Sequence, residues 1–116
     1  MQETIRKKYI PMTETTYYTL LAVIVPRHGY AIMQFVDRLS GGRIQLGTGT
    51  LYTMVGRLHA DGVVSIVMSE DGKKAYQLTE IGRELLREET ERLAKQLQDG
   101  RKILCGEEWN GYREDD

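Results

Sequence analysis

Hydrophobic residues recur at helical spacing in three separate segments of the first sixty residues. A spacing of i, i+3, i+4 and i+7 puts the members of each group on one face of a helix. The three apolar faces consist of Tyr17, Leu20, Leu21 and Ile24; of Ile32, Phe35, Val36 and Leu39; and of Leu51, Val55 and Leu58. The pattern predicts three short amphipathic helices packed around one core.

Residues at the ends of these segments indicate where the helices start and stop. Thr13 is a suitable N-cap for the first helix, and Thr48 can cap the third. The three helices are expected to end at Pro26, at Gly41-Gly42 and at Asp61-Gly62. Proline cannot continue a helix, and glycine supplies the left-handed residue that often ends one.

A hairpin and a long helix follow. The β-branched run Val63 to Met68 and the run Ala75 to Leu78 flank a turn that contains Asp71-Gly72, a strong hairpin signal. Thr79 can then cap a helix that continues to about Leu104. The predicted fold class is mainly α with a small β hairpin, in the order of a winged helix-turn-helix followed by a long C-terminal helix. In that arrangement the third helix enters the major groove of DNA.

The chain divides into four expected segments. These are a basic N-terminal leader at 1–12, a winged helix-turn-helix DNA-binding domain at 13–78, a C-terminal dimerisation helix at 79–104 and an acidic tail at 105–116. The leader contains Arg6, Lys7 and Lys8, which either form a DNA-contacting arm or serve only as a soluble leader.

The 116 residues carry a net charge of −1, but the charge is unevenly distributed. Residues 1–79 hold nine Lys and Arg against six acidic residues, whereas residues 80–116 hold seven against eleven. The mildly basic first part permits binding to a polyanion, although ordinary solvated charge explains it about as well. The longest apolar run is far too short to span a bilayer, and the N-terminus lacks the apolar stretch of a signal peptide. We therefore expect a cytoplasmic protein.

The sequence offers little for catalysis or metal binding. His28 and His59 have no Ser/His/Asp or Cys/His pattern around them, so a structural role is favoured for both. The one cysteine, Cys105, excludes an internal disulfide and a cysteine-based metal cage. The segment 47–50 is rich in glycine but lacks the Lys-Ser/Thr of a phosphate-binding P-loop. We expect no enzyme and no cofactor.

The third helix carries the candidate DNA-binding residues. Its first turn offers free backbone N–H groups and the hydroxyls of Thr48 and Thr50, which can meet the DNA backbone. Thr50, Thr53 and Arg57 then form one polar stripe opposite the apolar face, with Gly56 leaving room for a close approach. A solvated helix face is the alternative, and the spacing alone favours neither.

The hairpin tip adds two cations, Lys73 and Lys74, where a wing would reach the neighbouring minor groove or its phosphates. Lysine is common in any exposed turn, and Glu70 and Asp71 dilute the charge there. An ordinary solvated turn is therefore the stronger alternative for this pair.

The long helix carries a heptad-like seam. Its members alternate in steps of four and three residues: Leu86, Thr90, Leu93, Leu97, Gly100 and Leu104. Because the winged core already buries its own apolar faces, an additional seam favours a partner helix, most economically that of a second copy. Folding back onto the first helix of the same chain is the alternative.

Four groups of residues, in this order along the chain, resemble the PadR family of bacterial transcriptional regulators. They are His28-Gly29-Tyr30-Ala31-Ile32-Met33; Gly47-Thr48-Gly49-Thr50-Leu51-Tyr52; Arg57-Leu58 with Asp61-Gly62-Val63-Val64; and Ala75-Tyr76-Gln77-Leu78-Thr79-Glu80-Ile81-Gly82. The resemblance covers about residues 12–98. It implies that the third-helix motif extends from Thr48 through Arg57, which adds Gly49 and Tyr52 to the DNA-binding residues, and that the wing spans Ser69 to Lys74.

The resemblance also implies homodimers that repress promoters until a small aromatic or cationic molecule binds. With one long C-terminal helix, the chain resembles the short subfamily of this family, which includes multidrug-responsive repressors. In some members of that subfamily, a tryptophan on the dimerisation helix stacks on planar drugs. Here the only tryptophan, Trp109, lies beyond that helix. We expect a dimeric repressor that binds a palindromic operator. The alternative is a winged helix used only for protein–protein contact.

Overall fold

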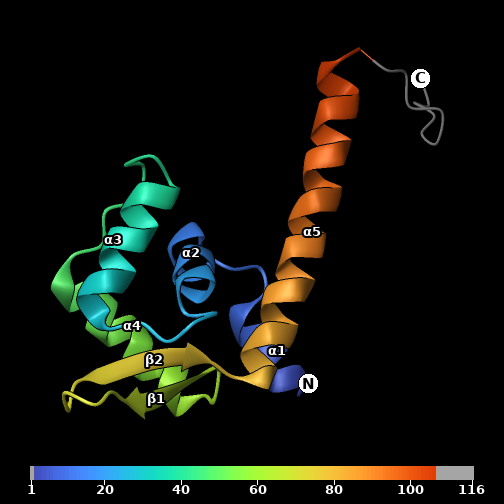
Figure 1. Ribbon diagram of the computed structural model, residues 1–116. Helices are drawn as coiled ribbons and strands as arrows, with labels where there is room; N and C mark the ends of the chain where they lie inside the picture. The colour runs from blue at the N-terminus through green and yellow to red at the C-terminus, as the bar shows by residue number, and fades with distance from the viewer. Residues whose placement is uncertain (1, 107–116) are drawn as a thin grey trace.

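The computed structural model describes residues 2–106 and contains five helices and one hairpin within that range (Figure 1). In chain order the elements are α1 (Glu3–Tyr9), α2 (Glu14–Ala22), α3 (Gly29–Leu39), α4 (Thr48–Ala60), β1 (Val64–Met68), β2 (Lys74–Leu78) and α5 (Glu80–Leu104). From α2 onward this is the predicted order, so the winged helix-turn-helix with a long C-terminal helix is confirmed.

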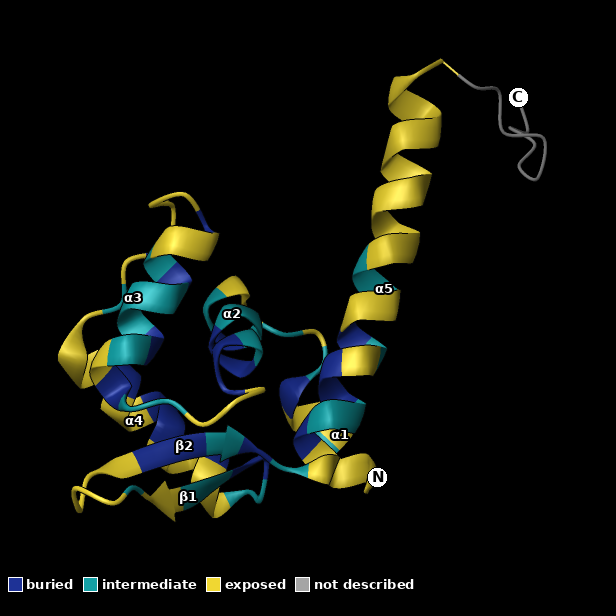
Figure 2. Cartoon of the chain, in the orientation of Figure 1, coloured by how far each residue is buried: buried dark blue, intermediate teal, exposed yellow. Residues whose placement is uncertain are grey.

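Helices α2, α3 and α4 pack together above the hairpin, and α5 extends away from them (Figure 1). Three side chains of the predicted apolar face of α4, Leu51, Val55 and Leu58, are at most 1% exposed, and Met54 joins them. Their neighbours in the core include Leu20 of α2 and Ile32 of α3. The buried faces of the three helices point toward one another (Figure 2). The side of α4 opposite these four residues therefore faces away from the core and is exposed.

The hairpin pairs β1 and β2 antiparallel, with Ile66 opposite Tyr76. A further isolated bridge joins Arg27 to Tyr76, and the N–H of Leu78 donates to the carbonyl of Val23 at 2.7 Å. The segment after α2 thus runs along the free edge of β2. This pairing explains why the first helix ends at Ala22 rather than at Pro26, as the sequence predicted.

Two expectations about core residues were wrong for related reasons. Ile24 was expected on the buried face of the first helix, but it lies beyond the helix end and is exposed. Leu39 occupies the last position of α3 and is also exposed, because the core ends before that turn.

Besides the early end of α2, the structure confirms three of the predicted helix ends and contradicts the one at Thr48. The side-chain oxygens of Thr13 and Thr79 accept backbone N–H groups of the first turns that they cap, both at 3.1 Å. Gly41 and Gly42 both have positive φ, 63° and 83°, as expected for a left-handed helix end. Thr48 does not cap α4, because the helix already includes it: Gly47 is the N-cap and makes no side-chain hydrogen bond.

Residues 3–9, expected as a leader, form helix α1. Tyr9 is buried, and its hydroxyl donates to the carboxylate of Asp61 at the end of α4, at 2.5 Å. On the other side of α1, Arg6 pairs with Glu88 of α5 at 2.9 Å. A seven-residue helix is marginal alone, so these tertiary contacts stabilise it and could not be read from local pattern.

Glu89 of α5 is a buried carboxylate, only 1% exposed. Its carboxylate accepts the backbone N–H of Met12 at 2.7 Å and two N–H groups of Arg92 at 2.5 and 3.0 Å. Burial raises the pKa of Glu89, but the hydrogen bonds from Arg92 and Met12 outweigh it, so the pKa ends below its usual range. The residue holds the chain ahead of α2 against α5.

We expect Glu89→Ala to lower the free energy of unfolding by about 1.5–3 kcal/mol, since buried groups lose a charged acceptor. Glu88→Ala is the matched control. It removes a surface pair one position away and should cost less than about 1 kcal/mol. Chemical denaturation of the three proteins measures both effects, and equal losses would contradict the role given to Glu89.

The same contact predicts a pH dependence. Because the folded-state pKa of Glu89 is lowered, its stabilisation is present above the unfolded value of about 4.3 and is lost as the pH falls through the folded value. The stability difference between wild type and Glu89→Ala should therefore be constant near neutrality and shrink on acidification below about pH 4. A difference that grows with acidification would contradict this sign.

Candidate nucleic-acid interface

The exposed face of α4 carries only small side chains along its central line. Gly49 and Gly56 lie there with Thr53 between them, and all three are exposed. A Cβ atom added at either glycine would meet nothing within 4 Å. Packing within the chain therefore does not require these glycines, although glycine in a helix interior costs about 0.5–1 kcal/mol relative to alanine. An external surface that approaches the helix backbone closely would explain them.

A groove of about 570 Å³ runs along one flank of this face, between α4 and the start of α2. It brings together Thr50, Thr53 and Arg57, the predicted polar stripe. Helix α2 and its N-cap contribute Thr13, Thr15 and Thr16, which were not among the predicted site residues. The flank thus combines five threonine hydroxyls with one guanidinium, and no acidic side chain lines it.

Arg57 also has an internal role. Its guanidinium lies 5.6 Å from the centre of the Tyr9 ring, where a cation is attracted to the aromatic face. Burial and the hydrogen bond to Asp61 raise the pKa of Tyr9, so its hydroxyl stays protonated. The ammonium of Lys8, 2.7 Å from Asp61, and the Tyr9 hydroxyl hold the pKa of that carboxyl below its usual range. Asp61, which interacts electrostatically with Arg57, is therefore already engaged by α1.

A second groove, of about 530 Å³, lies on the other flank of α4, between the first turn of α3 and the hairpin. It brings together Tyr52, Lys73 and Lys74, three predicted site residues. It also contains His28 and Tyr30, which sequence reasoning missed as site residues. The signal that could have found them is the turn ahead of α3, where exposed polar side chains follow a helix break.

The hairpin turn is held by its own side chains. The carboxylate of Asp71 accepts the hydroxyl of Ser69 and the backbone N–H of Lys73, and these bonds lower the pKa of Asp71. Gly72 has the positive φ, 78°, that the turn requires. The ammonium of Lys73 is mostly exposed and 4.0 Å from Asp71, so the tip presents cations beside one partly neutralised acid.

The proposed seam of α5 is divided by the structure. Leu86 is buried in the chain's own core, and the hydroxyl of Thr90 lies 2.6 Å from that of Tyr17 in α2. Leu93 is half-buried, whereas Leu97 is 53% and Leu104 89% exposed. The first two turns therefore pack on α2, as in the alternative considered above, and the later turns stand clear of the chain (Figure 2).

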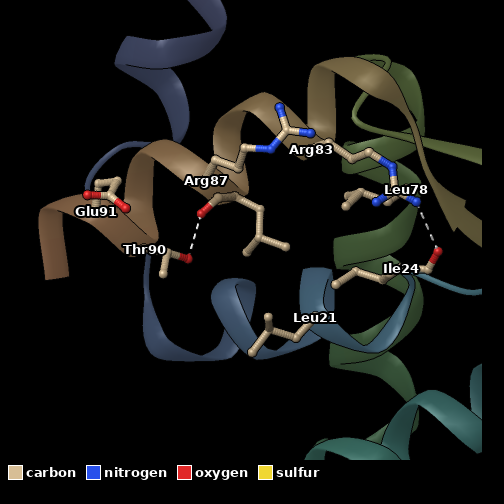
Figure 3. A pocket seen from close by; sticks show the side chains of 8 residues that line it. Leu21, Ile24, Leu78, Arg83, Arg87, Thr90 and Glu91 are labelled. Atoms are coloured by element: carbon tan, nitrogen blue, oxygen red, sulfur yellow. Dashed lines mark hydrogen bonds between the residues drawn. The ribbon is translucent and has the colours of Figure 1, made fainter. Parts of the chain in front are cut away.

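Between α2 and α5 lies a third groove, of about 450 Å³. Leu21, Leu78 and Leu86 give it an apolar lining. Arg83, Arg87 and Glu91 line it as well (Figure 3). Cys105 is exposed just after the end of α5. Trp109, which the sequence places beyond this helix, lies outside the described residues.

Within residues 2–106, no helix combines the length and the hydrophobicity needed to cross a membrane. The same part of the chain has no group of three or more His, Cys, Asp or Glu side chains that could hold a metal ion.

Comparisons with known proteins agree with this architecture. A family model described as the transcriptional regulator PadR-like family matches residues 18–88. An uncharacterized 37.1 kDa protein in transposon Tn4556 of Streptomyces fradiae is 39% identical over 70 residues, which cover 60% of this chain. Those residues cover 20% of that protein, so the match spans about a fifth of its length.

Three solved structures share the fold. A PadR-like transcription factor from Bacteroides fragilis is 27% identical, with a TM-score of 0.58 over 88% of this chain and 94% of that one. F93 from STIV, a winged-helix DNA-binding protein, is 23% identical, with a TM-score of 0.58 over 83% and 98%. A protein from Streptococcus mutans UA159 is 23% identical, with a TM-score of 0.65 over 86% and 91%.

A substitution at Gly56 in α4 should change protein stability and DNA affinity in opposite directions. Gly56→Ala should raise the free energy of unfolding by about 0.5–1 kcal/mol, because alanine favours the helix and the added Cβ meets nothing. It should nevertheless weaken binding to duplex DNA by on the order of 1 kcal/mol or more, since the methyl group would occupy the contact surface. Denaturation and fluorescence anisotropy measure the two effects. A more stable variant with unchanged affinity would remove Gly56 from the interface.

Proposed function

Because the chain belongs to the PadR-like family of transcriptional regulators, we propose that it is a sequence-specific regulator that inserts α4 into the major groove of its operator. The observation that carries the proposal is the exposed face of α4: small at its centre, at Gly49 and Gly56, and flanked by two grooves lined with hydroxyls and cations. Base edges are read by side chains that reach past a closely approaching helix backbone.

In this proposal the residues of the interface divide into two groups. Thr53 and Arg57 read base edges, because they stand on the exposed face beyond the first turn. Contacts to the DNA backbone come from the first turn of α4 and from the wing, and they involve Thr48, Gly49, Thr50, Tyr52, Lys73 and Lys74.

The regulator acts as a homodimer through the outer part of α5. Leu97 and Leu104 are exposed large apolar side chains on one helix face, with nothing in the described chain to cover them. Two copies related by a two-fold axis would bury this face and present two α4 helices to a palindromic operator.

The last part of the proposal is that the protein represses transcription and that binding of a small molecule relieves this repression. The groove between α2 and α5 is large enough for such a ligand and combines an apolar floor with a rim of Arg83, Arg87 and Glu91, which suits a flat aromatic molecule with polar edges. A ligand there would separate α5 from α2, and so alter the spacing of the two α4 helices.

The first test is to sequence the DNA fragments that the purified protein retains from a random pool. On the recovered operator, Thr53→Ala and Arg57→Ala should each lose about 1–3 kcal/mol relative to random duplex. Replacing both Lys73 and Lys74 by alanine should weaken all duplexes alike and flatten the salt dependence by up to about two phosphate contacts.

The controls are unfolding curves for each variant, which matter most for Arg57 because it also contacts Tyr9. If no duplex is retained, and binding to random DNA shows no salt dependence, the winged helix serves protein–protein contact instead.

Leu97→Asp tests the dimer. A carboxylate from each chain in one apolar contact is costly, so the variant should be monomeric by sedimentation and keep its fold, since Leu97 is already exposed. Gln98→Asp, one position away, is the matched control and should remain dimeric. Operator affinity should fall steeply only for Leu97→Asp, because a monomer engages one half-site. A dimeric Leu97→Asp variant would contradict the proposed interface.

A further inference from the structure

The groove between α3 and the hairpin is lined by hydrogen-bond donors from α3 and α4 as well as from the wing. We infer that it seats one phosphate group of the DNA backbone, held by the hydroxyls of Tyr30 and Tyr52 and by the ammonium groups of Lys73 and Lys74. This inference rests on the proposed function and adds to it a phosphate-binding role for Tyr30 and a positioning role for Gly29.

Tyr30 is the first part of the argument. It lies in the first turn of α3 and is 68% exposed, which is unusual for a large aromatic side chain. The side-chain amide of Gln34, one turn along α3, donates to the Tyr30 hydroxyl oxygen at 3.2 Å. Since that oxygen accepts from Gln34, the hydroxyl hydrogen is directed elsewhere. The Tyr30 hydroxyl can thus donate to an acceptor outside the chain while it accepts from Gln34.

Tyr52 is placed in the same groove by a missing side chain. A Cβ atom at Gly29 would lie 2.6 Å from the Tyr52 hydroxyl oxygen and 3.0 Å from its Cζ. The absence of that Cβ lets the end of the Tyr52 ring rest against the first turn of α3. Burial raises the pKa of Tyr76, and the proximity of Tyr52 adds to the effect, as expected for hydroxyls that share one groove. Gly29 is thus the residue that fixes where the Tyr52 donor sits.

The charge of the groove selects for an anion. Its lining includes Lys73 and Lys74 and no acidic side chain, and the first turn of α3 has none. Asp71, in the hairpin turn beside Lys73, accepts the Ser69 hydroxyl and the backbone N–H of Lys73, and it lies 4.0 Å from the Lys73 ammonium.

His28 keeps the two walls of the groove together. Its Nδ1 donates to the backbone carbonyl of Lys74 at 2.9 Å, and this bond ties the start of α3 to β2. A carbonyl oxygen can only accept, so Nδ1 carries the hydrogen. The distance between the Tyr30 and lysine donors is therefore set by a direct contact between their elements.

A backbone phosphate fits this groove better than a free phosphate ion. The donors are exposed side chains, which bind an isolated ion weakly in competition with water. Tyr52 belongs to α4, so a strand bordering the groove that α4 enters would pass over these donors. Polymer binding then supplies the local concentration that a free ion lacks.

Tyr30→Phe is the decisive variant, because it removes one neutral donor and keeps the ring. Affinity should fall about 3- to 10-fold on operator and random duplex alike, while the slope of log affinity against log salt stays unchanged. Tyr17→Phe, which removes a hydroxyl that faces α5 instead, is the matched control and should bind as wild type. Wild-type affinity for Tyr30→Phe, or a loss confined to the operator, would overturn the assignment.

Gly29→Ala tests the positioning of Tyr52. It should weaken duplex binding about as much as Tyr52→Phe, and the double variant should lose no more than either single one, because both act through one hydroxyl. Additive losses would overturn the link between the two residues. Thermal unfolding of each variant separates this effect from a general loss of structure.

Inorganic phosphate is the probe for the other source of the ligand. At matched ionic strength it should displace DNA no better than chloride, and Tyr30→Phe should not change that ratio. Displacement by phosphate that depends on Tyr30 would show a free-ion site and overturn the backbone assignment. If the wild-type protein binds no duplex, the proposed function itself is contradicted. If the wild-type protein binds duplex and Tyr30→Phe binds with the same affinity, only this inference is contradicted.

Discussion

The burial of one face of α4 is the constraint on which the rest of the structure depends. Leu51, Val55 and Leu58 are almost completely removed from water, and α2, α3 and the hairpin all pack around them. Because a helix has 3.6 residues per turn, fixing these positions also fixes Gly49 and Gly56 on the outside. The surface that we propose for DNA binding is therefore a direct consequence of which side chains form the core.

The two flanks of α4 differ in chemistry because different elements complete them. Toward α2, threonine hydroxyls surround Arg57, whose guanidinium is held against Tyr9 of α1. Toward the hairpin, tyrosine hydroxyls and lysines share a groove that α3 and β2 close together. A helix in a groove of DNA has one phosphate strand on each side, so in the proposed complex the protein would meet the two strands with different donors.

Helix α1 and the turn after it connect α5 to the end of α4. Arg6 reaches Glu88, the backbone of Met12 reaches the buried Glu89, and Lys8 and Tyr9 reach Asp61. The C-terminal end of α4 is thus linked, through α1 and the turn after it, to the helix that extends from the core. A change in the direction of α5 would act on these contacts, so they would connect the proposed ligand beside α5 with the position of α4.

The sequence by itself determined the order of elements from α2 onward, the buried face of α4, the Gly41-Gly42 helix end and the hairpin turn. These features follow from side-chain periodicity and from turn residues a few positions apart, which are local properties. Tertiary structure alone decided the end of α2, the existence of α1, the burial of Glu89 and the grouping of Tyr30 with Tyr52. Each depends on a partner dozens of residues away, such as Tyr76 for the segment after α2 or Asp61 for Tyr9, and no local pattern records where such a partner will lie.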